Sequence, residues 1–379
     1  VGTSTAAFVG VSPDARAHVN EPVACNNWAQ FLKEFGSGEG KATDLARAVF
    51  GFFMEGGGRC YVLNLGDAKA SLAGNPEQRT GLAAFEAIDD IAIVAAPGRT
   101  TTADYSDIIS HCERMEDRFG ILDAPDVQDV GQLTAIGTES ATSEEEAKPK
   151  PKNRGVRPND SPYCALYYPK IIIKEPDPFG NGENVAVPPS GHIAGIYART
   201  DRSRGVHKAP ANEGFRTALG LSYRVARFEQ GELNKKGVNC LRYFSSGGIR
   251  VWGARTLAAE ASEWRYINVR RLFNMVKESI AEGTNWTVFE PNDEILWGTV
   301  IRDVSAFLTT LWRDGALFGA TPAEAFFVKC DAENNPAESR DQGQLIVDVG
   351  IAPVKPAEFV TFRIGQYAGA SASSGAAEA

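Results

Sequence analysis

Short apolar runs that alternate with helix-like segments are the feature of this sequence that most constrains its fold. These runs are continuously apolar, as in RCYVLNL at Arg59–Leu65 and IAIVA at Ile91–Ala95. Such strands are typical of a mostly parallel sheet that is covered on both faces. The runs expected as strands are Thr5–Val11, Arg59–Leu65, Ile91–Ala95, Phe119–Leu122 and Ala165–Ile173. The sequence therefore predicts an α/β fold for the first half of the chain.

Helical patterns fill the intervals between these strands. Apolar residues recur at helical spacing in Thr43–Met54, and the three glycines from Gly56 to Gly58 end that helix. Pro188 and Pro189 disfavour a helix at the end of an irregular stretch, 175–190. Helices are expected at Asn27–Phe35, Thr43–Met54, near Ala103–Arg118 and around Ala211–Ala218.

Two longer amphipathic patterns mark the C-terminal part. The first runs from Ile267 to a stop at Gly283, and the second opens at Asp293 and stops at Gly315. Thr321-Pro322-Ala323-Glu324 fits a capping box with proline in the first turn. The strands expected are Trp286–Phe289, Phe326–Lys329, Gln344–Gly350 and Phe359–Ile364. This mixture predicts an α+β domain.

Two domains are expected, because 379 residues suffice for two cores of ordinary size. We place the first at 1–247 and the second at 248–366. Residues 138–159 are charged, contain proline and are nearly without apolar side chains, which predicts a flexible loop within the first domain. The small polar residues of 367–379 predict a mobile tail.

Composition argues against several classes of protein. The net charge of −9 disfavours a general nucleic-acid binder, whose surface is usually basic. No apolar run approaches the roughly 18 residues of a membrane-spanning helix, and we expect neither such a helix nor a secretory leader. The cysteines are scattered without a CxxC pair, which predicts reduced, buried thiols in a protein made in a cytoplasm. They are Cys25, Cys60, Cys112, Cys164, Cys240 and Cys330.

Patterns that suggest bound phosphate or metal have simpler interpretations here. Gly56 to Gly58 follow a helix instead of a strand, and no GK[ST] sequence comes after them, so they read as a helix end. The histidines lack the spacing of a metal site, and the adjacent His111 and Cys112 point in different directions on a helix. The four histidines are His18, His111, His192 and His207. We expect no metal and no cofactor.

A serine hydrolase is the enzymatic alternative, and its motifs are weak. Two segments could supply a serine nucleophile, Ser190-Gly191-His192 and Gly2-Thr3-Ser4. Neither has the GxSxG context of a nucleophile elbow. We therefore expect no catalytic residue and keep an α/β hydrolase as the runner-up. A plain binding module that forms a discrete oligomer is the third class considered.

Basic residues cluster on and just before the first C-terminal helix. They are Arg265, Arg270, Arg271 and Lys277. A run of charges usually means a solvated helix face. The same residues would also suit an acidic partner, since arginine pairs with carboxylates through two hydrogen bonds. The residues alone support the solvated face and the partner-binding surface equally.

An ordered set of motifs carries a resemblance to a known family. SEWRYINVRRLFNMVKESI at Ser262–Ile280, followed by NWTVFEPNDEILW to Trp297, is rich in aromatic and charged residues without a catalytic one. Further motifs include TSTAAFVG, IAIVAAPG, VPPSGHIAGIYARTDRSRGVHKAPAN, GIRVWGARTL and VGIAPVKPAEFVTFRI. Together they resemble contractile tail sheath proteins of myophage tails, R-type pyocins and extracellular contractile injection systems, along nearly the whole chain.

The resemblance implies a structural part of an injection machine. It implies a subtilisin-like α/β domain, an α+β C-terminal sheath domain and extended terminal arms. Subunits of the family form stacked hexameric rings around an inner tube and contract to drive the tube through a target envelope. The partners implied are further copies of the chain, the inner tube protein, and baseplate and cap or terminator proteins. Neither nucleic acid nor membrane insertion is expected. The particle, a phage tail or a tail-like device, is made in a bacterial cytoplasm.

Two kinds of site follow from the resemblance. Strands added to neighbouring subunits would come from Thr5, Ala6, Ala7, Phe8 and Val9 and from Phe359, Val360, Thr361, Phe362, Arg363 and Ile364. The helix Tyr266–Ile280 would grip the inner tube through Arg265, Arg270, Arg271 and Lys277, with the helix Asp293–Arg313 as its rival. Family members usually carry an N-terminal arm before TSTAAFVG, whereas this sequence starts almost at that strand.

Overall fold

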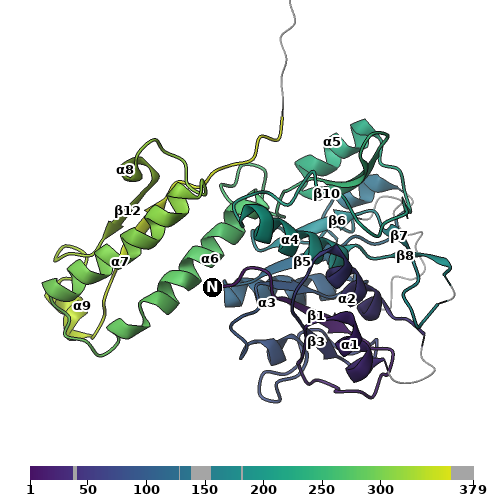
Figure 1. Cartoon of the computed structure of the whole chain (residues 1–379), viewed down its shortest axis with the longest axis horizontal. Coiled ribbons are helices and arrows are strands. Elements are labelled where there is room, and N and C mark those ends of the chain that lie inside the picture. The colour runs from purple at the N-terminus through teal and green to yellow at the C-terminus, as the bar shows by residue number, and fades with distance from the viewer. Residues whose placement is uncertain (37–40, 128, 138–154, 181, 360–379) are drawn as a thin grey trace, which may run out of the picture.

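The computed structural model describes residues 1–36, 41–127, 129–137, 155–180 and 182–359, which form two lobes (Figure 1). The larger α/β lobe ends with strand β11 (Gly248–Trp252), and the smaller C-terminal lobe begins with the long helix α6 (Ile267–Gly283). Helix α6 runs along the junction between the two lobes, so its contacts decide how they are joined.

An eight-stranded sheet forms the centre of the α/β lobe, in the order β11-β10-β6-β5-β4-β1-β3-β2. Its six inner strands pair in parallel, and β2 and β11 are antiparallel to their neighbours at the two edges. The strands are β1 (Ala6–Gly10), β2 (Val23–Cys25), β3 (Cys60–Asn64), β4 (Ile93–Ala95), β5 (Phe119–Asp123), β6 (Cys164–Tyr168), β10 (Val238–Phe244) and β11. The predicted α/β class is confirmed.

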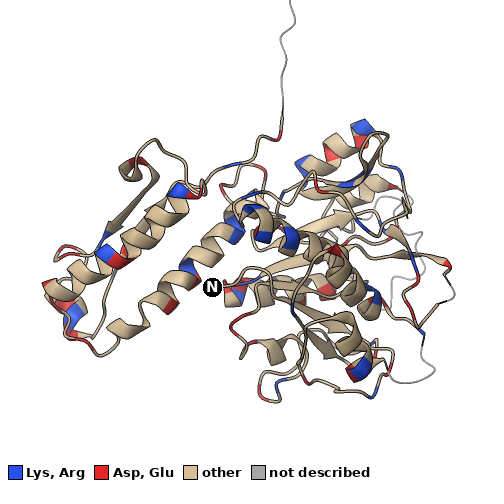
Figure 2. Ribbon diagram, viewed as in Figure 1, with Lys and Arg blue, Asp and Glu red and all other residues tan. Residues whose placement is uncertain are grey.

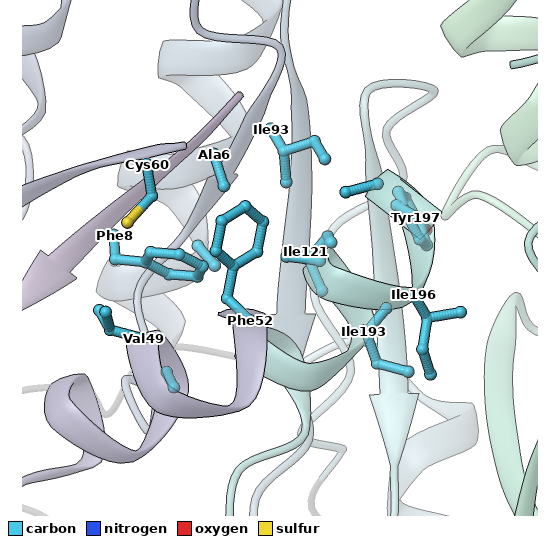
Figure 3. Packing of buried hydrophobic residues seen from close by; sticks show 14 of the residues in the cluster. Ala6, Phe8, Val49, Phe52, Cys60, Ile93, Ile121, Ile193, Ile196 and Tyr197 are labelled. Carbon is cyan, nitrogen blue, oxygen red and sulfur yellow. The ribbon is translucent and has the colours of Figure 1, made fainter. Parts of the chain in front are cut away.

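Both faces of this sheet are covered, which explains why its strands are continuously apolar. Along β1, Ala6 and Phe8 belong to one core cluster with the helices α2 and α4, whereas Ala7 and Val9 belong to a second cluster with α3. Figure 3 shows the first cluster, in which Phe8 packs against Phe52. The helical elements of the lobe are α1 (Trp28–Phe35), α2 (Asp44–Glu55), η1 (Gly81–Phe85), α3 (Thr102–Met115), η2 (Val130–Thr134), α4 (Ser190–Arg204) and α5 (Arg227–Lys235).

Local sequence sets the ends of these helices. Thr43 caps α2 by accepting a hydrogen bond from the Ala46 N–H at 3.3 Å, and Gly56, with φ of 118°, ends it in the left-handed region. Thr101 and Asp104 form a capping box at the start of α3. The glycines after α2 therefore stop a helix, as the sequence predicted.

Helices α2 and α4 approach closely because glycines face the contact. A Cβ at Gly191 would lie 2.3 Å from Ala48 Cα, and one at Gly195 would lie 2.5 Å from the Phe52 carbonyl oxygen. Both distances are far below ordinary van der Waals contact. The two helices can cover this face of the sheet together only while both positions lack a side chain.

The C-terminal lobe is built on the apolar stripes of α6 and α7, with a small antiparallel sheet beside them. Leu272 and Val276 of α6 share a core cluster with Val300, Val304 and Leu308 of α7. The elements after α6 are η3 (Asn285–Thr287), α7 (Glu294–Arg313), α8 (Pro322–Ala325), β12 (Phe326–Lys329), α9 (Ala337–Asp341) and β13 (Asp348–Ile351). In the α/β lobe, a separate sheet contains β7 (Ile171–Lys174), β8 (Asn184–Val187) and β9 (Gly220–Leu221).

Two expectations about helices are wrong. Residues 211–218 form no helix, because their backbone covers the edge of β11: the Asn212 and Phe215 N–H groups donate to the carbonyl oxygens of Val251 and Ile249. The second error concerns Pro188 and Pro189, which were expected to disfavour a helix. Helix α4 begins directly after Pro189. Proline is tolerated there because the first turn of a helix has no partner for its N–H groups.

The strand and boundary expectations in the C-terminal part need correction as well. Trp286–Phe289 is not a strand: Asn285–Thr287 form the 3₁₀ turn η3, and Val288 and Phe289 continue it as a turn. The boundary between 247 and 248 would split the hairpin of β10 and β11, so the first domain extends past Trp252. The strand predicted at Gln344–Gly350 is confined to β13, and residues 138–154 and 360–379 lie outside the described part. The expected loop 138–159 is wrong at its end, because Arg157 is buried and donates to the carbonyl oxygens of Lys236 and Leu257.

The six cysteines are all free and buried, as predicted. Across the described ranges, no helix combines the length and the apolar character that a membrane span requires.

Replacing Gly195 with valine should destabilise the α/β lobe. The new side chain meets the backbone of α2, and overpacking of this kind costs about 1–3 kcal/mol in the free energy of unfolding. Gly231 on α5 is the matched control, because a Cβ there meets nothing within 4 Å. Gly231→Ala should instead stabilise by about 0.5–1 kcal/mol. Urea unfolding of both variants compares them, and equal stabilities would contradict the proposed tight contact.

Candidate functional site

Ser190, the candidate nucleophile, begins α4 and is hydrogen-bonded directly to the carboxylate of Asp123. Its Oγ donates to Asp123 Oδ2 at 2.7 Å, and its N–H donates to Oδ1 at 2.8 Å. The Gly98 N–H donates to Oδ2 at 3.1 Å. Burial raises the pKa of Asp123 to about 6, although the hydrogen bonds from Ser190 and Gly98 oppose this shift. Asp123 thus ties the end of β5 to the start of α4.

His192 does not complete a catalytic triad. Neither of its buried ring nitrogens has a hydrogen-bond partner among the described residues, and its ring fills the space beside Gly51 of α2. Burial lowers the pKa of His192 to about 3. A triad needs a histidine that accepts the proton of the serine, but here Ser190 donates to Asp123 itself. This geometry gives the hydrolase alternative no support.

Metal ligands do not gather in the part of the chain that the structure describes. No group of three or more histidine, cysteine, aspartate or glutamate side chains there could hold a metal ion. The charged residues that do gather lie at the junction of the two lobes, along α6 (Figure 2).

Arg271 of α6 forms a buried ion pair with Asp201 of α4. Its two terminal nitrogens donate to the two carboxylate oxygens at 3.0 and 2.6 Å, and both side chains are only 3% exposed. The same guanidinium donates to the Thr3 carbonyl oxygen at 2.9 Å and lies over the ring of Tyr197. Arg271 therefore joins α6, α4 and the first residues of the chain.

The other three basic residues differ in their surroundings. Arg270 lies over the rings of Trp264 and Tyr163, 3.8 and 4.6 Å from the ring centroids, and burial lowers its pKa. Arg265 is partly buried beside the ring of Tyr266. Lys277 is 61% exposed and pairs with Glu116 of the α/β lobe.

The four basic residues that were expected to contact the tube therefore do not form one exposed surface. Arg271 is committed to Asp201 and is buried, whereas Arg270 is partly buried between two aromatic rings. The sequence placed both beside the apolar stripe of α6, but it missed that this side of the helix packs on a second domain. Asp201 lies 70 residues away in the chain and carries no local signal.

Amide side chains complete the attachment of α6 to the α/β lobe. Asn268 donates to the carbonyl oxygens of His207 and Val354 at 2.8 and 3.1 Å. One turn and a half later, Asn274 donates to the Arg118 carbonyl oxygen at 3.4 Å. The helix therefore contacts the α/β lobe through these polar groups and through Ile267, while Leu272 and Val276 pack with α7.

Glu358 anchors the last described segment to the α/β lobe. Its carboxylate accepts two hydrogen bonds from Arg255, both at 2.8 Å, one from Asn234 at 2.6 Å and one from the Tyr266 hydroxyl at 3.2 Å. Burial by itself raises the pKa of Glu358, but the hydrogen bonds from Arg255 and Asn234 outweigh it, so the pKa lies below its usual value. This carboxylate clamp fixes where the chain leaves the body, just before Phe359.

Strands β12 and β13 form a sheet with two open edges. They pair with each other in antiparallel register from Phe326 opposite Ile351 to Lys329 opposite Asp348, and neither has a second strand partner among the described residues. An edge of unpaired N–H and C=O groups readily accepts another strand. This sheet is the strongest candidate for a contact through backbone hydrogen bonds.

The expected role of Thr5–Val9 as a strand shared between subunits is wrong. Strand β1 lies inside the large sheet, with Ala6, Ala7 and Phe8 paired to β3 on one side and to β4 on the other. Its side chains are fully buried. The second expected donor, Phe359–Ile364, is described only at Phe359, which is exposed and lies outside any strand.

Two family models match successive parts of the chain. The model described as phage tail sheath protein central domain matches residues 72–257, and the phage tail sheath C-terminal domain matches residues 259–366. The two matches meet after β11 and before α6, which is where the structure separates its lobes.

Curated relatives are similar over about half of this chain. A tail sheath protein of Vibrio phage KVP40 is 31% identical over 184 residues, which are 48% of this chain and 26% of that protein. The major tail sheath protein of Serratia phage KSP20 is 30% identical over 207 residues, which are 52% of this chain and 50% of that protein. The chain thus spans between a quarter and a half of these two relatives.

Solved structures are similar over nearly the whole chain. A chain of the anti-feeding prophage baseplate has a TM-score of 0.79 and 29% identity, covering 97% of this chain and 94% of its own length. A chain of the sheath complex of an extracellular contractile injection system in the contracted state has a TM-score of 0.75 and 29% identity, covering 97% and 92%.

Replacing Arg271 with alanine should destabilise the protein strongly. The change leaves Asp201 buried without its partner, which costs about 3–5 kcal/mol in the free energy of unfolding. Lys277→Ala removes an exposed pair on the same helix and should cost less than about 1 kcal/mol. Urea unfolding measures both. A loss for Arg271→Ala as small as that for Lys277→Ala would show that the buried pair does not hold the lobes together.

Proposed function

This chain belongs to the contractile tail sheath family, and from that premise we propose that it is a structural subunit that polymerises as stacked hexameric rings around an inner tube. The polymer contracts to drive the tube through a target envelope. Support comes from the similarity over both lobes to sheath assemblies, one of them in a contracted state. In this proposal the α/β lobe is the subtilisin-like domain of the family, without its catalytic chemistry. The chain's partners are other copies, the inner tube, the baseplate and a cap or terminator protein.

The two open edges of the β12–β13 sheet are the observation that carries this proposal. A strand from a neighbouring subunit would extend the sheet through backbone hydrogen bonds, each worth about 0.5–1.5 kcal/mol net. The donor would be Phe359–Ile364, as the terminal arm of a neighbouring copy. The clamp at Glu358 supports this assignment, because it fixes the base of that arm on the α/β lobe.

Contraction needs links that persist while larger bodies change their contacts. The shared strands would act as these links, and each subunit would rotate about them as one rigid body. The junction of the lobes is held by buried pairs such as Arg271 with Asp201, which supports rigid motion of the whole subunit. Exposed ion pairs at the surface, each worth little, would be the contacts exchanged.

The exposed side of α7 replaces α6 as the surface that holds the inner tube. Arg302, Ala306 and Arg313 are all exposed, and their spacing of four and seven residues puts them on one face of the helix. This face lies opposite the buried stripe at Val300, Val304 and Leu308. Arg302 pairs with its exposed neighbour Asp303 at 3.1 Å, but such a surface pair is worth little and could be exchanged for a contact with an acidic tube surface. The particle that contains it would be assembled in a bacterial cytoplasm.

Removing the expected arm should stop assembly. In the natural full-length protein, truncation after residue 358 removes the donor strand, while truncation after residue 366 removes only the expected tail. The longer form should give hollow tubes of stacked rings by negative-stain electron microscopy, as the untruncated protein does, and the shorter form should give single subunits or small oligomers. Tubes from both forms would contradict the strand exchange, and no tubes from the untruncated protein would contradict the sheath function.

Charge reversal on α7 should separate the sheath from its tube. A variant with Arg302→Glu and Arg313→Glu should still polymerise, yet retain less than a tenth of the inner tube protein in sedimented sheaths. Arg16→Glu, at an exposed position on the α/β lobe, is the control and should retain the tube as the unmodified protein does. Equal tube content in all three proteins would show that this face of α7 does not hold the tube.

A further inference from the structure

An exposed apolar surface lies at the turn between α6 and α7, at the far end of the C-terminal lobe (Figure 1). We call this surface the apolar tip; it consists of Trp286, Val288, Phe289 and Ile295. Phe289 is fully exposed and Ile295 is 79% exposed. Four large apolar side chains within ten residues gain nothing from contact with water. The isolated subunit gives no reason for such a cluster.

Phe289 carries backbone strain in addition to its exposure. Its φ of 71° lies in the left-handed region, which a bulky side chain rarely adopts. Glycine would occupy this position without strain. Backbone strain of this kind clusters at functional sites, so it supports a functional role for this turn.

The rim of the apolar tip is acidic. No lysine or arginine occurs between Lys277 and Arg302, whereas five acidic residues do. They are Glu278, which faces Asp117 of the α/β lobe, and the four that surround the turn: Glu282, Glu290, Asp293 and Glu294. Figure 2 shows mainly red residues at this end of the lobe, with a blue one beside α9, where Arg340 lies over the ring of Trp297. A surface that fits the tip must therefore be basic and must offer apolar or aromatic groups.

The same chain carries a surface with this chemistry near the base of α6. A cavity of about 630 Å³, which we call the basic groove, is lined by Arg204, Lys208, Lys355, Trp252, Tyr266 and Phe359 among other residues. Lys208 pairs with Glu213 at 3.4 Å, whereas Arg204 and Lys355 form no ion pair with any described residue, so their charges are available. Trp252 and Phe359 are exposed aromatic residues on its wall.

The tip cannot reach the groove of its own subunit. Tyr266, at the start of α6, lines the groove, and the tip follows the end of the same helix. The 17 residues of α6 hold the two apart by about 25 Å, at 1.5 Å per residue. Contact between the two surfaces therefore requires two copies of the chain.

We propose that the apolar tip of one subunit docks into the basic groove of a second copy. The two surfaces are complementary in charge, and both carry aromatic groups. Because they are different patches of one chain, their contact is head-to-tail and continues from copy to copy as a ring or a helix. The inference rests on the proposed sheath function and names a contact within it that strand exchange does not supply.

Paired charge reversals test the contact directly. Glu290→Lys on the tip and Lys355→Glu in the groove should each reduce the sedimentable polymer at least tenfold, because each places like charges opposite one another. The two changes combined should restore at least half of the polymer. Glu77→Lys, an exposed reversal in the α/β lobe, is the control and should leave assembly unchanged.

Phe289→Gly provides a second, independent signature. The change relieves the left-handed strain, so the melting temperature of the single subunit should stay equal or rise while the yield of polymer falls at least tenfold. A variant that merely misfolds would show a lower melting temperature instead. This combination separates loss of docking from loss of folding.

The outcomes distinguish the proposal from its alternatives. Normal assembly of Glu290→Lys, Lys355→Glu and Phe289→Gly would overturn it. Loss of assembly in Glu290→Lys with normal assembly in Lys355→Glu would also overturn it, because the tip would then dock on another partner, such as the inner tube. Failure of the unmodified protein to polymerise would overturn the sheath function and this inference together.

Discussion

The buried ion pair between Arg271 and Asp201 is the constraint on which the arrangement of the two lobes depends. Two charges withdrawn from water must stay together, because an unpaired one would cost several kcal/mol. The pair also holds Thr3, through the Arg271 guanidinium and through the Thr3 hydroxyl, which donates to Asp201. Among the polar contacts of α6 with the α/β lobe, this buried pair constrains the orientation of the helix most, and the surfaces of the C-terminal lobe are oriented with it.

Local patterns in the sequence predicted the elements better than their surroundings. The continuous apolar runs identified the inner strands, since burial on both faces leaves no polar alternation. The stripe from Val269 to Ile280 likewise identified α6. It did not show what lies against the opposite side of that helix, because Asp201 and Glu116 come from distant parts of the chain. Basic residues on a helix look the same in a sequence whether they meet water or a second domain.

The failed expectations share a physical cause. Residues 211–218 have a helical pattern, yet their backbone groups are used to cover the edge of β11. Thr5–Val9 has the composition of an exchangeable strand, yet two neighbours already occupy its edges. Tertiary hydrogen bonding overrode local preference in both places. The open edges of β12 and β13 are the opposite case, since the folded chain leaves them unpaired, and edges of this kind are hazards unless they serve an interface.

The contact of Arg271 with Thr3 also sets an order of events during synthesis. It joins residues 268 positions apart, so it forms only after Arg271 has left the ribosome. The clamp at Glu358 closes later still, when Arg255 and Asn234 are already folded into the α/β lobe. Domains fold from the N-terminus as they emerge. The surfaces of the C-terminal lobe thus reach their final positions after the α/β lobe has emerged, and a chain at an earlier stage of synthesis does not present them to finished copies.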